Sequence, residues 1–255
     1  MNQITLLQAV LIAAWVGLLM SRAVGYSLLT MVQTGMATGL VVGIIMHNVP
    51  QAMIITASIQ LIYMGLIAPG ANLPSVVPLG VAIALPIALV SALSPEQAIA
   101  IAVPVALLGS YFNTLRRVIN AFYVHLTDRF ASELNEKGMD LSTIVLPGLT
   151  SFLLFAILTF VAIYVGAPLV SQFIKVLPAN ILHALNIVGG GLPAIGIALT
   201  LIIIGRKELL VFFFVAYFVS VMLKSLNVNM VVYAILGGAM AYLYVFLSKK
   251  QSVKG

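Results

Sequence analysis

The side chains that can make polar contacts inside the apolar part of this sequence are mostly neutral. Amides both donate and accept hydrogen bonds, which suits an uncharged, hydroxyl-rich ligand such as a sugar. A buried amide without a partner costs on the order of 1–3 kcal/mol, so each group requires a ligand or a neighbouring helix. One group lies between residues 48 and 72 and a second between 180 and 186: Asn48, Gln51, Thr56, Ser58, Gln60 and Asn72, then Asn180, His183 and Asn186.

The chemistry of a self-powered pump is missing from the apolar runs. Ion-coupled pumps usually place a carboxylate near the middle of the membrane, whereas the six acidic residues here lie between the runs or at their edges. The sequence has no phosphate-binding P-loop. It has no cysteine, which excludes disulfides and thiolate chemistry. We therefore expect no catalytic residue, no metal site and no cofactor in this chain.

The composition predicts an integral membrane protein. Hydrophobic residues make up 62% of the chain and charged residues only 7%, against about 25% charged in an ordinary soluble domain. The net charge of +6 comes from basic residues placed singly or in pairs between apolar stretches. That distribution follows the positive-inside rule and argues against nucleic-acid binding. The first apolar run has no basic residue before it and no small-residue cleavage site after it, so we interpret it as a retained span.

The apolar runs set out the expected helices, since about 20 helical residues cross the hydrocarbon core. The long polar connection, 116–140, is expected to be cytoplasmic because it is rich in arginine and lysine. Alternating spans then place the C-terminus in the cytoplasm as well. Within this region, 111–135 is typical of an amphipathic helix at the inner interface, either an anchor or a docking surface. The runs are 4–20, 26–47, 51–67, 76–93, 97–115, 141–170, 179–205, 209–223 and 228–248.

Two Gly/Pro-rich stretches predict broken helices, at 65–78 and at 186–196. Irregular backbone at membrane depth is tolerated where protein or a water-filled cavity receives its polar groups. A break in each half of a chain indicates a transporter's binding site and internal repeats. We favour a re-entrant path for 51–75, which would place the N-terminus inside, over a full crossing, which would place it outside.

The predicted fold is an all-α membrane bundle of several spans, with re-entrant or broken helices and inverted repeats. It forms one transmembrane domain over 1–255, divided into a first half (1–110), a charged cytoplasmic loop (111–140) and a second half (141–255). The plainer alternative for Gln60, Asn72 and Asn186 is hydrogen bonding between helices. The glycines at 189–191 could equally serve close helix packing.

Several motifs resemble a known family. They are the run 58–65 (SIQLIYMG), the turn 70–72 (GAN), and 185–190 (LNIVGG) followed by Pro193 and Gly196. Together they are similar to the IIC membrane component of the mannose-family phosphoenolpyruvate-dependent sugar phosphotransferase system. This family includes mannose, fructose, sorbose and N-acetylgalactosamine permeases. The similarity runs through most of the chain.

The resemblance implies partners and an energy source. IIC chains form the translocating unit with a IID membrane chain in the bacterial inner membrane, and the pair assembles into larger oligomers. Cytosolic IIA and IIB components carry the phosphoryl group on histidine, so no residue of this chain is expected to carry a phosphoryl group. Elevator-like movement of a core domain is implied, and phosphorylation traps the sugar inside.

This chain departs from the family pattern at several positions near the first break. An amide in place of a carboxylate at Gln60 still binds sugar, and it suits an N-acetyl group or an acidic sugar. The departures are His47-Asn48 for Gly-Asp, Gln60 for Glu, Ala52 and Thr56 for glycines, and Thr34-Gly35 for Arg-Pro.

The resulting prediction is a IIC subunit that moves a hexose or amino sugar, mannose-like or N-acetylgalactosamine-like, inward for phosphorylation by IIB. Two alternatives stay open: a facilitative transporter or channel that works alone, and a membrane scaffold subunit without transport. The expected partners are IID, IIA, IIB, the sugar and the lipid bilayer, without nucleic acid. The predicted substrate-binding residues are Gln60, Gly70, Asn72 and Asn186, with Gln51 as a weaker candidate.

Overall fold

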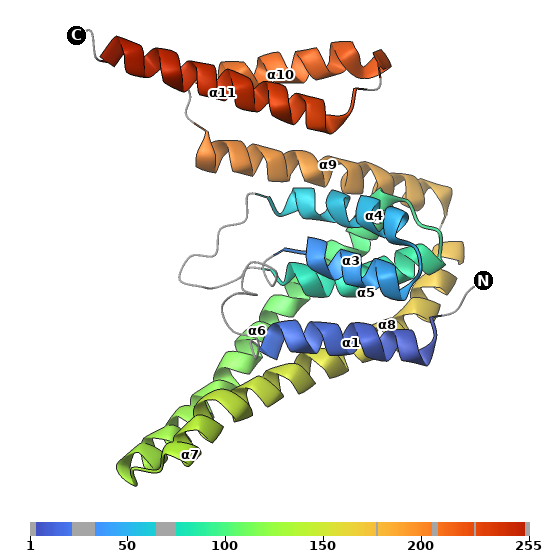
Figure 1. Cartoon of the computed structure of the whole chain (residues 1–255). Helices are drawn as coiled ribbons and strands as arrows, with labels where there is room; N and C mark the ends of the chain where they lie inside the picture. Colours follow the sequence, from blue (N-terminus) through green and yellow to red (C-terminus); the bar gives the residue numbers. More distant parts are fainter. Residues whose placement is uncertain are drawn as a thin grey trace. The chain divides into compact units, whose positions relative to one another are not determined.

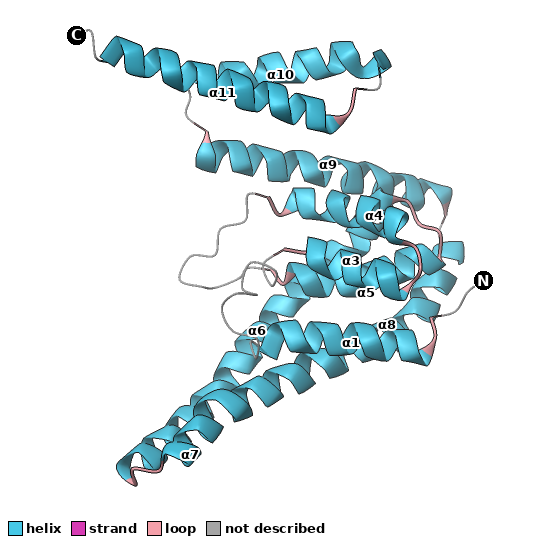
Figure 2. Cartoon of the chain, viewed as in Figure 1, coloured by secondary structure: helices cyan, strands magenta, loops and turns pink. Residues whose placement is uncertain are grey.

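The computed structural model describes residues 4–21, 34–64, 75–176, 178–205, 209–226 and 228–252. Every regular element in these ranges is helical, as predicted (Figures 1 and 2). The elements are α1 (Leu6–Ser21), α3 (Met36–Ile45), α4 (Val49–Ile62), α5 (Val77–Val90), α6 (Pro95–Ser132), α7 (Glu136–Asp140), the π-helical turn η3 (Leu141–Val145), α8 (Leu146–Val176), α9 (Ala179–Ile204), α10 (Leu210–Met222), the 3-10 turn η5 (Leu223–Leu226) and α11 (Met230–Ser252).

The helices fall into two compact units, Met1–Thr200 and Leu201–Gly255. Within the described residues, three segments are long and apolar enough to cross a membrane: Pro95–Ser132, Glu136–Val170 and Asn180–Ile203. The remaining apolar helices have 10–17 residues. The functional residues discussed below lie in the first unit.

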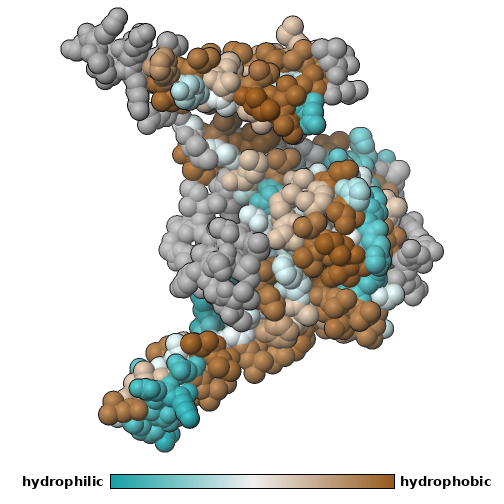
Figure 3. Space-filling model, in the orientation of Figure 1, coloured by the Kyte–Doolittle hydropathy of each residue, from teal (hydrophilic) through white to brown (hydrophobic). Residues whose placement is uncertain are grey.

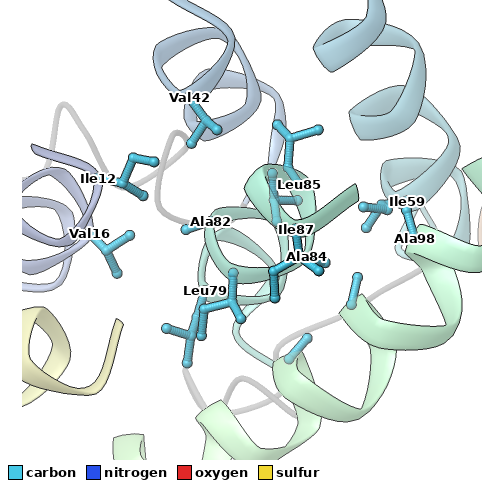
Figure 4. Close-up of a cluster of buried hydrophobic side chains, with 14 of the residues drawn as sticks. Ile12, Val16, Val42, Ile59, Leu79, Ala82, Ala84, Leu85, Ile87 and Ala98 are labelled. Carbon is cyan, nitrogen blue, oxygen red and sulfur yellow. The ribbon is translucent and has the colours of Figure 1, made fainter. Parts of the chain in front are cut away.

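Helix α5 is the centre of the first unit. Nearly all of its residues are apolar and buried, as expected for a helix that is hydrophobic on every side. Figure 4 shows α5 side chains such as Leu79 and Leu85 among those of Ile12 and Val16 from α1, Val42 from α3, Ile59 from α4 and Ala98 from α6. At about 21 Å, α5 is shorter than the hydrocarbon core of a bilayer and is surrounded by protein.

The charged region 111–140 is not a loop, and that part of the prediction is wrong. Helix α6 begins at a capping box formed by Ser94 and Gln97 and continues without interruption to Ser132. Arginine, glutamate and leucine are good helix formers, so a change from apolar to charged residues does not end a helix. The helix expected over 111–135 is therefore the second half of α6.

The α6–α8 hairpin turns where Leu134 adopts a positive φ of 53°. Asn135 Oδ1 then accepts a hydrogen bond from Gly138 N–H at 3.0 Å and starts α7. The two arms are joined by Tyr123 Oη and Thr150 Oγ1 at 2.6 Å and by Thr127 Oγ1, which donates to Ser142 Oγ at 2.8 Å. Hydrophilic surface gathers at the α7 end of the hairpin (Figure 3).

Arg116 ties this hairpin to α1. Its side chain is buried, and Nη1 donates to the carbonyl oxygen of Met20 at 3.1 Å in the last turn of α1. The guanidinium carbon lies 6.0 Å from the centre of the Phe155 ring on α8. A cation at a helix C-terminus is favourable because it meets the negative end of the helix dipole. One side chain therefore joins α1, α6 and α8.

We expect Arg116→Met to lower the free energy of unfolding by about 2 kcal/mol, because it leaves the buried Met20 carbonyl without a donor. Arg129→Met is the matched control. It removes an exposed ion pair with Glu133 on the same helix and should cost less than about 1 kcal/mol. Thermal unfolding in detergent measures both, and equal losses would contradict the role of Arg116.

The break predicted at 186–196 is also absent, because α9 is one continuous helix. Proline removes one backbone hydrogen bond, yet transmembrane helices tolerate it. The glycines serve packing instead. A methyl group at Gly189 would lie 2.7 Å from the carbonyl carbon of Glu96, and one at Gly196 would lie 2.6 Å from the carbonyl oxygen of Ile62. Close packing, the alternative reading of these glycines, therefore accounts for Gly189.

The re-entrant path for 51–75 stays a prediction, because residues 65–74 lie outside the described ones, but both ends of the segment can be placed. Gln51 lies beside the α3–α4 turn, and the last turn of α3 is bonded to the beginning of α1 by Gln8 Nε2, which donates to Ile45 O at 3.2 Å. Ser75 instead leads into α5 beside the beginning of α3. Helix α4 thus takes the chain from one end of the bundle to the other.

The contacts of α1 with α6 and with the α3–α4 turn place the start of α1 at the end of the bundle away from α7. The last turn of α1 is held by Arg116, from which α6 continues toward the turn at Leu134. The first turn of α1 is instead held at the α3–α4 turn.

Candidate functional site

Three helix ends meet around Gln60. Helix α3 begins after Gly35, α4 ends two residues after Gln60, and α5 begins at Val77. The Gly35 N–H donates to Gln60 Oε1 at 2.7 Å. A methyl group at Gly35 would lie 3.2 Å from Val77 Cγ1 and 3.4 Å from Gln60 Oε1, so a glycine allows the three ends to approach this closely.

The two helix beginnings at this site carry no side-chain cap. Neither Gly35 before α3 nor Val76 before α5 makes a capping hydrogen bond through a side chain. The first amides of a helix lack partners within the helix, and the N-terminus carries a partial positive charge. Interrupted helices that direct such ends toward a polar solute are typical of transporter binding sites.

Two buried hydroxyl groups border the same region. Tyr63 follows Gln60 by three residues, which makes them neighbours on the surface of α4, and Ser75 precedes Val77 by two. Both side chains are at least nine-tenths buried, and their oxygen atoms have no hydrogen-bond partner among the described residues. A buried hydroxyl without a partner carries a desolvation cost that a bound ligand would remove.

Among the predicted binding residues, Gln60 lies in this site and Gln51 does not. Gln51 is exposed and accepts a hydrogen bond from Asn48 Nδ2 at 3.0 Å. It precedes Gln60 by nine residues, about 13 Å along α4. Gly70 and Asn72 lie outside the described residues. They belong to the segment between Met64 and Ser75, which joins the end of α4 to the beginning of α5.

Asn186 makes a contact between helices. Its Oδ1 accepts a hydrogen bond from Ser94 Oγ, at 3.4 Å, at the start of α6. The contact of α9 with the end of α4 is at Gly196, which packs against the carbonyl group of Ile62. Asn186 precedes Gly196 by ten residues, about 15 Å along α9. Helix–helix hydrogen bonding, the alternative for this amide, describes its contact in the structure.

The comparison with known families decides what kind of protein carries this site. The family model described as the sorbose-specific IIC component of the phosphotransferase system matches residues 6–243. The chain belongs to this family. It is similar to the sorbose-specific EIIC component of Klebsiella pneumoniae, with 26% identity over 82% of this chain and 77% of the relative.

Two further relatives of this IIC component have other sugar names. The mannose-specific EIIC component of Escherichia coli K12 is 25% identical over 82% of this chain and 77% of its own. The fructose permease IIC component of Bacillus subtilis is 25% identical over 84% and 78%. The family resemblance inferred from the motifs is thereby confirmed.

Solved structures share the fold of this IIC component. One described as a membrane protein aligns with a TM-score of 0.79 at 23% identity, covering 98% of this chain and 99% of the other. A cryo-EM structure of the mannose transporter ManYZ with microcin E492 aligns with a TM-score of 0.59 at 25% identity, covering 98% of each chain. The predicted all-α membrane bundle is confirmed. The predicted elevator movement and inverted repeats stay predictions.

The histidines of this IIC component lie outside the site. His47 is at the α3–α4 turn with a positive φ of 54°, His125 is on the hairpin arm of α6, and His183 is exposed on α9. The groups that surround Gln60 are instead amides and hydroxyls. Such a set can bind a neutral polar solute and orient it.

Proposed function

We propose that this IIC component carries a hexose or an amino sugar inward for phosphorylation by a cytosolic IIB component. The membrane partner would be a IID chain, and IIA would supply the phosphoryl group to IIB. The proposal rests on the neutral site around Gln60, where two helix beginnings without side-chain caps and a side-chain amide meet. Family membership supports the partners, because a IIC component of this system works with three others, IIA, IIB and IID.

The neutral character of the site favours trapping by phosphorylation over ion coupling. The described site has amide, hydroxyl and backbone groups and no carboxylate, the group that ion-coupled transporters usually place near the middle of the membrane. Energy would then come from converting the sugar into a phosphate ester, which keeps it in the cytoplasm. Elevator-like movement and assembly into larger oligomers remain part of this proposal.

We place the protein in the bacterial inner membrane with the α7 end of the hairpin in the cytoplasm. Arg117, Arg129 and Lys137 gather in this part of the chain, as the positive-inside rule requires. The start of α1, at the opposite end of the bundle, would then face outward, and the C-terminus would lie inside.

Uptake of radiolabelled sugar tests this proposal. In cells that express the chain with IID, IIA and IIB, we expect sugar phosphate to accumulate, and omission of IIB to abolish accumulation. A panel of hexoses and N-acetylhexosamines identifies the substrate. Equilibration of free sugar without IIB would support a transporter that works alone. No uptake of any sugar by the full set would support the scaffold alternative.

A further inference from the structure

The orientation of the Gln60 side-chain amide follows from its contact with α3. The Gly35 backbone N–H can only donate, so the atom 2.7 Å away must be the Gln60 oxygen. The amide nitrogen, Nε2, therefore lies on the other branch of the side chain. This nitrogen has two hydrogens and no hydrogen-bond partner among the described residues. Gln60 can therefore offer a ligand a hydrogen-bond donor, its Nε2 group.

The neighbouring helix beginnings add further donors. The first amides of α3 are donors at the positive end of that helix, whereas α5 offers only the Val77 N–H, because Pro78 has no N–H and the Val76 and Leu79 N–H groups bond to Ala106 O and Val76 O. The hydroxyl groups of Tyr63 and Ser75 are buried, lack partners among the described residues and can each donate. No carboxylate or cation lies on α3, α4 or α5. The site thus has several donors beside Gln60 Nε2, and the end of α4 adds backbone carbonyl acceptors.

We propose that Gln60 determines substrate specificity by donating through Nε2 to a sugar substituent whose oxygen accepts hydrogen bonds, a carbonyl or carboxylate oxygen. An acetamido sugar or a hexuronate has such an oxygen. A free hexosamine instead has an ammonium group, which only donates and therefore cannot accept a hydrogen bond from Gln60 Nε2. This inference deepens the proposed function and rests on it.

Gln60→Glu inverts the polarity of the ligand-facing atom while it keeps the contact with α3. One carboxylate oxygen still accepts from Gly35 N–H, and the second becomes an acceptor in place of Nε2. The matched control is Gln51→Glu, which makes the same change on the same helix. Gln51 is exposed and about 13 Å away along α4.

The experiment measures binding of four sugars to the purified IIC–IID complex, without phosphoryl transfer. The sugars are an N-acetylhexosamine, the corresponding hexuronate, the hexose and the free hexosamine. For the wild type, we compare the hexosamine with whichever of the N-acetylhexosamine and the hexuronate binds more tightly. We expect that sugar to bind at least ~10-fold more tightly than the hexosamine, because one hydrogen bond of about 1.4 kcal/mol changes affinity tenfold. Whether it is the acetamido sugar or the hexuronate identifies the accepting group.

In Gln60→Glu, this preference should reverse in favour of the hexosamine, whereas Gln51→Glu should retain the wild-type ratio. An unchanged ratio in Gln60→Glu, or a wild type that prefers the hexosamine, would overturn the inference. If Gln60→Glu does not assemble, Gln60→Met keeps the chain length without the donor and should abolish the preference; a preserved preference overturns the inference. Failure of the proposed function is distinguishable, since the full set of components would then accumulate no sugar phosphate.

Discussion

The Gln60→Ala variant is expected to take up sugar at a rate about 100-fold lower than the wild type, while it remains in the membrane with IID. Alanine removes the acceptor that holds Gly35 at the start of α3 and the donor available to the ligand. Each lost hydrogen bond costs about 1–3 kcal/mol, and 1.4 kcal/mol corresponds to a factor of ten. Uptake rates at equal amounts of membrane-embedded protein measure the effect.

The control for this variant is Gln51→Ala, which shortens the same side chain at the other end of α4. Its uptake should match the wild type, since Gln51 bonds only to Asn48 at an exposed turn. Unchanged uptake in Gln60→Ala would remove Gln60 from the binding site. Loss of the assembled complex together with uptake would assign Gln60 to the folding of α3 instead.

The Gly39→Ala variant is expected to have the largest effect on stability, about 3 kcal/mol. Helices α3 and α4 cross here, and the added methyl group would lie 2.5 Å from Thr56 Cγ2 and 2.6 Å from Thr56 Cβ. Helix α3 is also held on its other side, where Trp15 Nε1 donates to Thr38 Oγ1. Overpacking of this kind forces backbone shifts. Thermal unfolding of the purified protein in detergent measures the loss.

A second-site change tests the cause of this loss. Thr56→Gly removes the three atoms nearest to the new methyl group, so the double variant should regain most of the stability of Thr56→Gly alone. Gly166→Ala is the matched control, because an added methyl group there has no neighbour within 4 Å. It should be neutral or stabilising. Equal losses at Gly39 and Gly166 would contradict the crossing argument.

The positions of the helices could be predicted well from hydropathy. The run 4–20 corresponds to Leu6–Ser21 and the run 76–93 to Val77–Val90. Both lipid and a packed protein interior require apolar side chains, so the pattern marks a helix in either environment. For the same reason it does not tell them apart: α5 is buried in protein, whereas α9 faces outward over most of its surface.

The wrong predictions share a physical cause. A glycine, a proline or a charged side chain affects its immediate surroundings and does not by itself end a helix. Residues 111–132 stay helical because charged side chains extend into water without disturbing the backbone. Residues 186–196 stay helical because the glycines let α9 approach Glu96 and Ile62. The positions of the two ends of 51–75 could not be predicted either, because the contacts that place them join residues far apart in the sequence.

The candidate site could be predicted only in part. Gln60 stands out as an amide in an apolar run, but so do Gln51 and Asn186, which are bonded elsewhere. Composition does not reveal which amide already has a partner. Tyr63 and Ser75 were missed for the converse reason, since a hydroxyl becomes informative only when it is buried without a partner. Tyr63 does lie within the motif 58–65, which was the available signal.

The central position of α5 has a consequence for how the protein is made. During synthesis α5 emerges before α6 and α8, two of the helices that later surround it, so acyl chains must contact it first. Leaving lipid for protein gains little hydrophobic free energy, because lipid tails are as apolar as leucine. Retention of α5 must then rest on steric fit, such as Gly80 against the Ala102 carbonyl, and on the Val76 N–H bonded to Ala106 O at 2.8 Å. Assembly of this bundle is thus an exchange of lipid neighbours for better-fitting protein ones.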